Sequence, residues 1–199
     1  MFRHVALLGI VGMVDDIRWI TGPGFKSNGD ILILIGRNKE ELGGSEYVKS
    51  IHQKEKGIPP QIDLEEEKRV QEFCLEAISL GLIESAHDIS EGGLACCLAE
   101  CSFLSRGRMG VSAHLKDSIR SDALLFGESQ SRIVITSKEK NREKIFDLAR
   151  ERGVEAMDIG RSGGERITIS QGDKKLIDVT VAAAAKAWRE AIPDIFRIK

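Results

Sequence analysis

Short apolar runs alternate with helical spacings along the chain. Ile31–Ile35 is a continuous β-branched-rich run between turn residues, which predicts a buried strand. Asp63 is a good N-cap residue for apolar positions at helical spacing over residues 64–78, and Gly81 supplies a C-terminal stop. The same criteria predict helices over about 45–55, 94–104, 138–152 and 180–192, a short helix before Gly127, and extended segments over 83–88, 109–115, 132–137, 166–170 and 175–179.

This alternation, with a hairpin turn at residues 171–173, predicts an α+β fold in which a mixed β-sheet packs with helices. Residues 1–16 differ, because their segment 5–14 is apolar and punctuated by glycines. It is interpreted either as a remnant strand of a preceding domain, with the α+β domain over 17–199, or as an ordinary first strand. Since exposed strand edges invite pairing, the first interpretation predicts a homo-oligomer.

Charge and hydropathy narrow the class of protein. The 199 residues include 29 Lys and Arg against 31 Asp and Glu, a formal net charge of −2 with both signs interspersed. Such a balance argues against a nucleic-acid binder of the electrostatic kind. No apolar run approaches the roughly 20 residues that a membrane helix needs. We therefore expect a cytoplasmic protein that acts on neither nucleic acid nor membrane.

Two groups of metal-ligand residue types have ordinary structural alternatives. Cys96, Cys97 and Cys101 crowd into one apolar helical segment and Cys74 lies apart. They are interpreted as small reduced core residues, because nothing completes the spacing of a soft-metal site. The acidic residues 65–67 follow the N-cap and are interpreted as a solvated helix start, with a metal site as the alternative.

The stretch from Ala86 to Leu94, AHDISEGGL, reads as a strand end, a polar turn, two glycines and a helix start. Gly92 and Gly93 would leave backbone N–H groups open to a phosphate at the helix N-terminus. Asp88 has the carboxylate that a phosphate-bridging Mg²⁺ prefers, and Ser90 suits either an N-cap or a phosphate donor. The alternative is a capped tight turn with a buried polar pair.

A second polar stretch precedes a predicted strand. Glu128 and Gln130 can hydrogen-bond a substrate, and Arg132 can pair with a carboxylate or phosphate; Ser129 lies between them. Alternatively these residues cap the preceding short helix and turn the chain. A third stretch, ELGGSEY over residues 41–47, is by itself a weak phosphate-loop pattern.

Together, in this order, ELGGSEY, HDISEGGL (87–94) and FGESQSR (126–132) resemble the C-terminal part of phosphoribosylformylglycinamidine synthase, in its large ATP-dependent subunit. The resemblance spans essentially the whole chain. It implies the fold of the C-terminal domain of aminoimidazole ribonucleotide synthetase. It further implies a ligase of de novo purine biosynthesis that uses ATP and glutamine-derived ammonia to convert formylglycinamide ribonucleotide to the amidine. Selenophosphate synthetase and thiamine-monophosphate kinase belong to the same superfamily and are alternatives.

The resemblance also assigns roles to residues. It gives Asp88 to Mg²⁺ and Ser90, with the glycines after it, to ATP or ADP, in a pocket that family members keep in a non-catalytic role. The alternative function is accordingly a structural or regulatory nucleotide-holding domain. Glu128-Ser129-Gln130 is the counterpart of a substrate-contacting triplet in the first half of the enzyme. His87 does not match the family's catalytic histidine, so no catalytic residue is assigned.

Partners follow from the same resemblance. They are the remaining domains of the synthetase, a glutaminase and a small accessory subunit. Because the substrate-binding and catalytic groups would lie largely on those other domains, the chain is expected to be inactive alone.

Overall fold

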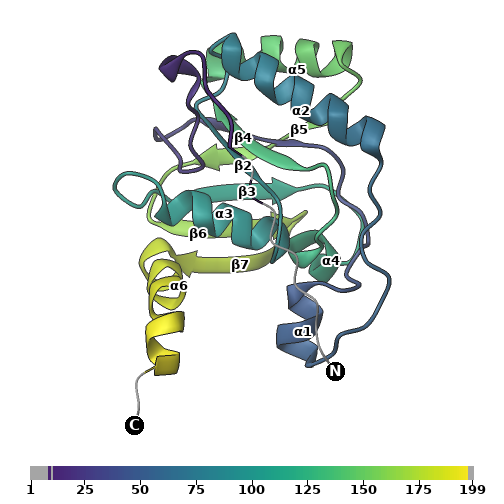
Figure 1. Ribbon diagram of the computed structural model, residues 1–199. Coiled ribbons are helices and arrows are strands. Elements are labelled where there is room, and N and C mark those ends of the chain that lie inside the picture. The colour runs from purple at the N-terminus through teal and green to yellow at the C-terminus, as the bar shows by residue number, and fades with distance from the viewer. Residues whose placement is uncertain (1–8, 10, 197–199) are drawn as a thin grey trace.

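A seven-stranded mixed sheet organises the chain. The computed structural model describes residues 9 and 11–196 (Figure 1). The strand order is β2-β4-β1-β5-β3-β6-β7, and β3 with β6 is the parallel pair among antiparallel neighbours. The α+β prediction is therefore confirmed. The strands are β1 (Ile31–Ile35), β2 (Ser85–Asp88), β3 (Val111–Leu115), β4 (Ile133–Ser137), β5 (Ala156–Ser162), β6 (Arg166–Gln171) and β7 (Lys174–Thr180).

Six α-helices accompany the sheet in the described part of the chain. They are α1 (Glu46–His52), α2 (Leu64–Ser79), α3 (Gly93–Phe103), α4 (Ser121–Phe126), α5 (Arg142–Glu151) and α6 (Val181–Phe196). Two short 3-10 helices, η1 (Ile17–Trp19) and η2 (Glu139–Asn141), lie before β1 and α5. All the predicted helices are present, and each predicted strand is found within a few residues of its expected bounds.

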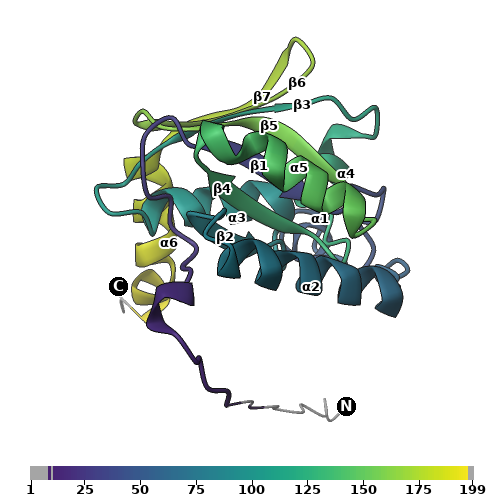
Figure 2. The same ribbon diagram turned by 90° about the horizontal axis from the view of Figure 1, so that it is seen from above.

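Helices cover both faces of β1, which explains why all five of its residues are buried. Ile31, Ile33 and Ile35 pack in one cluster with side chains of α2 and α5. Leu32 and Leu34 point the other way and pack with side chains of α3, α4 and α6. Figure 1 shows α2 and α5 together at the top of the molecule, and Figure 2 shows them side by side over the sheet.

Helix α2 begins as its sequence predicts. The Asp63 carboxylate accepts hydrogen bonds from the backbone N–H groups of Glu66 and Glu65, and these bonds lower its pKa. Gly81 follows the end of the helix with φ +66°, a left-handed conformation that glycine adopts without steric cost. In the acidic first turn Glu65 is exposed, whereas Glu66 and Glu67 are half-buried, and Glu67 belongs to the site described below.

The structure tests only part of the prediction made for the N-terminal segment. Residues 1–8 and 10 lie outside the described residues, and residues 9 and 11–16 form no strand. Val11 and Met13 are 99% and 95% exposed, and Figure 2 shows this segment running away from the domain body. The boundary at residue 16 and the homo-oligomer stay predictions.

The cysteines are free thiols. Cys74, Cys97 and Cys101 are buried as predicted, whereas Cys96 is exposed, so its prediction as a core residue is wrong. Burial raises the pKa of Cys74, and a hydrogen bond with Cys101 together with burial raises that of Cys97. Thiols with raised pKa values are poor nucleophiles at neutral pH. Among the described residues, no helix has the length and apolar character needed to cross a membrane.

Candidate functional site

The predicted site residues gather at one end of the sheet. Because β2 runs antiparallel to β4, Asp88 at the end of β2 is paired with Ile133 at the start of β4. Ile35, the last residue of β1, is paired with Ile133 on its other side. The loops that follow β1 and β2 and precede β4 therefore meet at this end. These loops carry all three sequence motifs.

A cleft of about 330 Å³ lies beside Asp88. Asp88 and Ser90 line it together, and both residues are exposed. Gln130, Ser131 and Arg132 line it from the second motif, and α2 closes it. The full lining is Glu67, Val70, Gln71, Asp88, Ile89, Ser90, Gln130, Ser131, Arg132 and Ile133. Two of the three motifs thus contribute to one cleft.

Asp88 retains an accessible carboxylate. Its side chain is 73% exposed, and its Oδ1 lies 3.3 Å from Nδ1 of His87. His87 is only 14% exposed and its Nε2 lies 3.1 Å from Oε2 of Glu100 in α3. The imidazole thus lies between two carboxylates and is largely buried, which supports a structural role for His87.

Glu128 joins the other two motifs. Its Oε1 accepts one hydrogen bond from the backbone N–H of Glu46 and another from that of Gly92, each at 2.9 Å. Glu46 opens α1 behind its N-cap Ser45, whose hydroxyl accepts a hydrogen bond from the N–H of Val48. A carboxylate is favoured at such N-terminal N–H groups. One side-chain oxygen therefore holds α1 and the turn before α3 together.

The expected open N–H groups at Gly92 and Gly93 are not open in this structure. Gly92 donates to Glu128, and Gly93 donates to the carbonyl of Ser90 at 3.0 Å. Gly93 is required for a different reason: its φ is +67°, and a Cβ there would lie 2.7 Å from the carbonyl oxygen of Gly127. The phosphate-binding role of both glycines stays a prediction, and a phosphate at Gly92 would have to displace Glu128.

Arg132 serves the loop itself. It is 3% exposed, and it donates from Nη2 to the carbonyl of Gly127, from Nε to that of Ser129 and from Nη1 to Oδ1 of Asn38. Burial lowers its pKa to about 10, so the guanidinium remains charged at neutral pH. Three of its five N–H groups thus bond within the chain, to two backbone carbonyls and an amide oxygen, and the pairing of Arg132 with a carboxylate or phosphate stays a prediction.

The other residues of this motif differ in access. Ser129 is fully buried, and its Oγ has no hydrogen-bond partner in the described part of the chain. Gln130 is exposed in the cleft, and its side-chain amide donates to the carbonyl of Glu128. Of the residues predicted to contact substrate or an interface, Gln130 is the one whose side chain is openly available.

Glu67 lines the cleft, although the sequence analysis interprets it as part of a solvated helix start. Its Oε2 accepts a hydrogen bond from the hydroxyl of Ser131 at 2.6 Å, and its Oε1 accepts one from the amide of Gln71. The spacing of Glu67 and Gln71, four residues apart on one helix face, was the available signal. The bond to Ser131 spans 64 residues of sequence and could not be read from it.

The side chains at this cleft suit Mg²⁺ only as a site that nucleotide phosphates and water complete. Within the described residues, no group of three or more His, Cys, Asp or Glu side chains is arranged to hold a metal ion. Mg²⁺, however, is commonly bound by one or two carboxylates together with substrate phosphates and water. Asp88, exposed at a strand end, fits the role of a single protein ligand of that kind.

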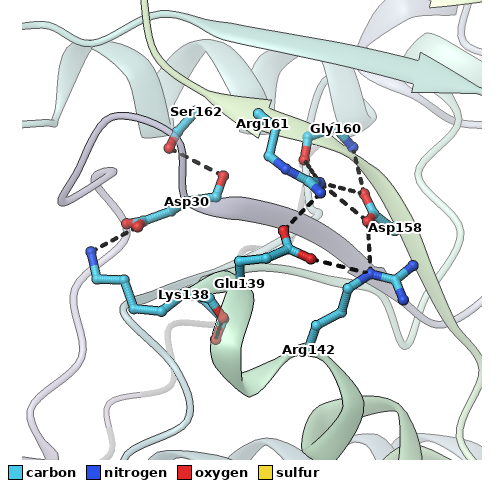
Figure 3. Close-up of polar contacts among 9 residues, drawn as sticks. Asp30, Lys138, Glu139, Arg142, Asp158, Gly160, Arg161 and Ser162 are labelled. Atoms are coloured by element: carbon cyan, nitrogen blue, oxygen red, sulfur yellow. Dashed lines mark hydrogen bonds and ion pairs between the residues drawn. The ribbon is translucent and has the colours of Figure 1, made fainter.

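A second polar cluster lies at the opposite end of the sheet, where β1 begins (Figure 3). The ammonium of Lys138 lies 2.7 Å from Oδ1 of buried Asp30, and this hydrogen bond raises the pKa of Lys138. Beside it, Asp158 accepts from both Arg142 and Arg161. Opposite charges are paired throughout this cluster, which is the pattern of a structural network.

The chain resembles known proteins in sequence. A family model described as "AIR synthase related protein, C-terminal domain" matches residues 27–172. Phosphoribosylformylglycinamidine synthase subunit PurL of Moorella thermoacetica is 43% identical over 187 residues, 94% of this chain and 25% of the relative. The subunit of the same name from a Thermoanaerobacter species is 42% identical over 186 residues, again covering 94% and 25%. The chain thus spans about a quarter of the length of these curated relatives.

Solved structures share the fold. Thermotoga maritima PurL complexed with FGAR superposes with a TM-score of 0.75 at 19% identity, over 85% of this chain and 30% of that one. The hydrogenase maturation protein HypE of E. coli gives a TM-score of 0.56 at 16% identity, over 80% and 51%. At these identities the likeness concerns the fold.

Proposed function

The chain belongs to the family of AIR synthase related proteins, matching its C-terminal domain, and from this membership we propose that it acts as part of a phosphoribosylformylglycinamidine synthase. The reaction is the ATP-dependent conversion of formylglycinamide ribonucleotide and glutamine-derived ammonia to the amidine, in purine biosynthesis in the cytoplasm. The observation that carries the proposal is the 43% identity with a PurL subunit over 94% of the chain. The more distant likeness to HypE gives no comparable support to other members of the superfamily.

Within that enzyme the chain holds a nucleotide at the cleft beside Asp88. Support comes from the accessible carboxylate of Asp88 and the exposed Ser90 on the same cleft. Among proteins of this fold, T. maritima PurL has been solved with ATP and with ADP. Asp88 would hold Mg²⁺, and a bound Mg²⁺ neutralises charge on the nucleotide phosphates. Ser90 would donate to a phosphate oxygen.

The remaining domains of the synthetase, a glutaminase and a small accessory subunit are the proposed partners. A PurLQS assembly of T. maritima contains a chain of this fold. The chain's share of its relatives, about a quarter of their length, supports a site completed by other parts of the enzyme.

The first expected result is that the isolated chain does not form the amidine. Substrate, nucleotide and metal need more donors than this cleft offers, since the described residues bring no three metal-binding side chains together. The assay supplies ATP, ammonia and formylglycinamide ribonucleotide and measures ADP. ADP release at an enzyme-like rate, on the order of one turnover per second, would contradict the expectation.

The nucleotide proposal is tested through Asp88. With few phosphate contacts to offset the entropy of association, we expect the chain to bind Mg-ADP with a Kd of about 1 mM. At about 10 mM Mg-ADP this stabilises the fold by about 1.4 kcal/mol. Asp88→Asn should abolish that stabilisation and leave the ligand-free melting temperature unchanged, because its side chain is exposed.

His87→Gln is the matched control. It alters the neighbouring residue and should retain the Mg-ADP effect, because the His87 side chain is largely buried and His87 does not line the cleft. Thermal melts of the three proteins, with and without Mg-ADP, provide the comparison. A wild-type chain that gains no stability, or an Asp88→Asn variant that gains as much as wild type, would refute the assignment.

A further inference from the structure

Residues 44–56, called the α1 strap here, leave the domain body and return to it at one point. Gly44 donates its N–H to the carbonyl of Lys56 at 3.0 Å, which closes the base of the strap. At that base Gly43 and Gly57 cross closely: a Cβ on Gly43 would lie 2.1 Å from the carbonyl oxygen of Ile58, and one on Gly57 2.6 Å from Cα of Gly43. The base is thus a narrow glycine crossing, and glycines can absorb a change of φ and ψ with which the strap would pivot there.

The strap contributes little to the core. Helix α1 contains no buried residue, and residues 49–57 are exposed. The buried Ser45 serves the strap's own helix, since its hydroxyl donates to the carbonyl of Leu42 and accepts from the N–H of Val48. Segments with few buried apolar contacts open locally at a small fraction of the free energy of global unfolding.

A ring contact and a hydrogen bond join the strap to α4 and the loop after it. The ring of Tyr47 stacks on that of Phe126, with centroids 4.8 Å apart and planes 5° from parallel. The backbone N–H of Glu46 donates to Oε1 of Glu128. The second contact is charge-assisted, and such bonds are about twice as strong as neutral ones.

The same Glu128 oxygen also accepts the hydrogen bond of Gly92, in the turn between Ser90 and Gly93. We propose that the α1 strap is a hinged flap and that Glu128 is its latch, which ties the position of the strap to the state of the Ser90–Gly93 turn. A group that takes the Gly92 N–H displaces the Glu128 carboxylate and releases the Glu46 N–H with it. Conversely, a swing of the strap leaves the carboxylate bonded to Gly92 alone. The latch rests on contacts within the chain and does not depend on which ligand the cleft binds.

Amide hydrogen exchange of the whole chain, followed by NMR, tests the latch. Glu128→Ala removes the shared acceptor, so the amides of both Glu46 and Gly92 should exchange at least about tenfold faster. The amides within α1 should follow them. Glu128→Gln keeps one acceptor oxygen without the charge, and should place both amides between wild type and Glu128→Ala.

Two controls accompany this test. Glu46→Gln changes a strap side chain that pairs with Lys49, while the latch uses the Glu46 backbone, so exchange at Gly92 should not change. Slow exchange at Ile33, in the buried centre of β1, shows that each variant is folded. The proposal is overturned if Glu128→Ala speeds exchange at only one of the two amides or at neither. If Glu128→Ala does not fold, the same requirement applies to Glu128→Gln.

Discussion

Replacing Arg132 with Met should cost about 4 kcal/mol of the free energy of unfolding. The guanidinium satisfies the carbonyls of Gly127 and Ser129 and the amide oxygen of Asn38, and the arginine is buried. Methionine fills similar space and leaves these acceptors without a donor. Each unsatisfied buried polar group costs about 1–3 kcal/mol. Urea unfolding of wild type and variant measures the difference.

Arg37→Met is the matched control for Arg132→Met. Arg37 pairs with Glu155 at 2.7 Å, but its side chain is 65% exposed. Exposed pairs contribute about 0–1 kcal/mol, so this variant should remain close to wild type. Arg132→Lys should lose most of what Arg132→Met loses, because an ammonium cannot reproduce the forked donor geometry. A loss below about 1 kcal/mol for Arg132→Met would show that the loop does not depend on these bonds.

The elements that sequence predicts best are those with a local cause. The β1 run is apolar throughout because both faces of that strand are buried, and its predicted bounds match. Asp63 and Gly81 delimit α2 through bonds and φ values within a few residues. The 171–173 turn likewise joins β6 and β7, with Gly172 at φ +55°. In each case the residues that determine the structure are close in sequence.

Strand β5 is the element that the sequence analysis missed, although it lies between β1 and β3. Its residues do not alternate cleanly between buried and exposed, and its register with β1 shifts between Leu32 and Ile33. Its half-buried residues Asp158 and Arg161 pair with each other, and Arg161 also pairs with Glu139. A pattern of period two therefore does not appear, and tertiary pairing determines the strand.

The candidate site likewise has features with a local cause and features that depend on distant residues. The turn at residues 88–93 and the accessible Asp88 follow from local residue types, and the sequence placed them correctly beside a helix start. Glu128, by contrast, meets Glu46 and Gly92 across 82 and 36 residues of sequence. Nothing in its neighbours distinguishes a glutamate that faces substrate from one that holds two loops together. Whether a charged side chain has a partner within the fold is known only from its three-dimensional contacts, and the sequence does not contain these.

Strand β5 can be tested at Gly160. Gly160→Ala should lower the free energy of unfolding by at least about 3 kcal/mol. Its φ of +147° lies in a region that is essentially limited to glycine, and strain there costs about 1–3 kcal/mol. In addition, a Cβ at this position would lie 1.9 Å from the carbonyl oxygen of Ser112 on the neighbouring strand β3. Because that atom belongs to the backbone, β3 and β5 would have to separate.

Gly164→Ala is the reference for a positive-φ glycine without a steric collision. Gly164 follows β5 with φ +72°, and a Cβ there would meet nothing within 4 Å. Gly164→Ala should therefore lower the free energy of unfolding by about 1 kcal/mol, the cost of a left-handed backbone alone. The excess loss in Gly160→Ala, measured in the same urea titration, contains the collision with β3 and the greater backbone strain at φ +147°. Equal losses in the two variants would mean that β5 does not approach β3 as closely as the pairing of Gly160 with Ala113 requires.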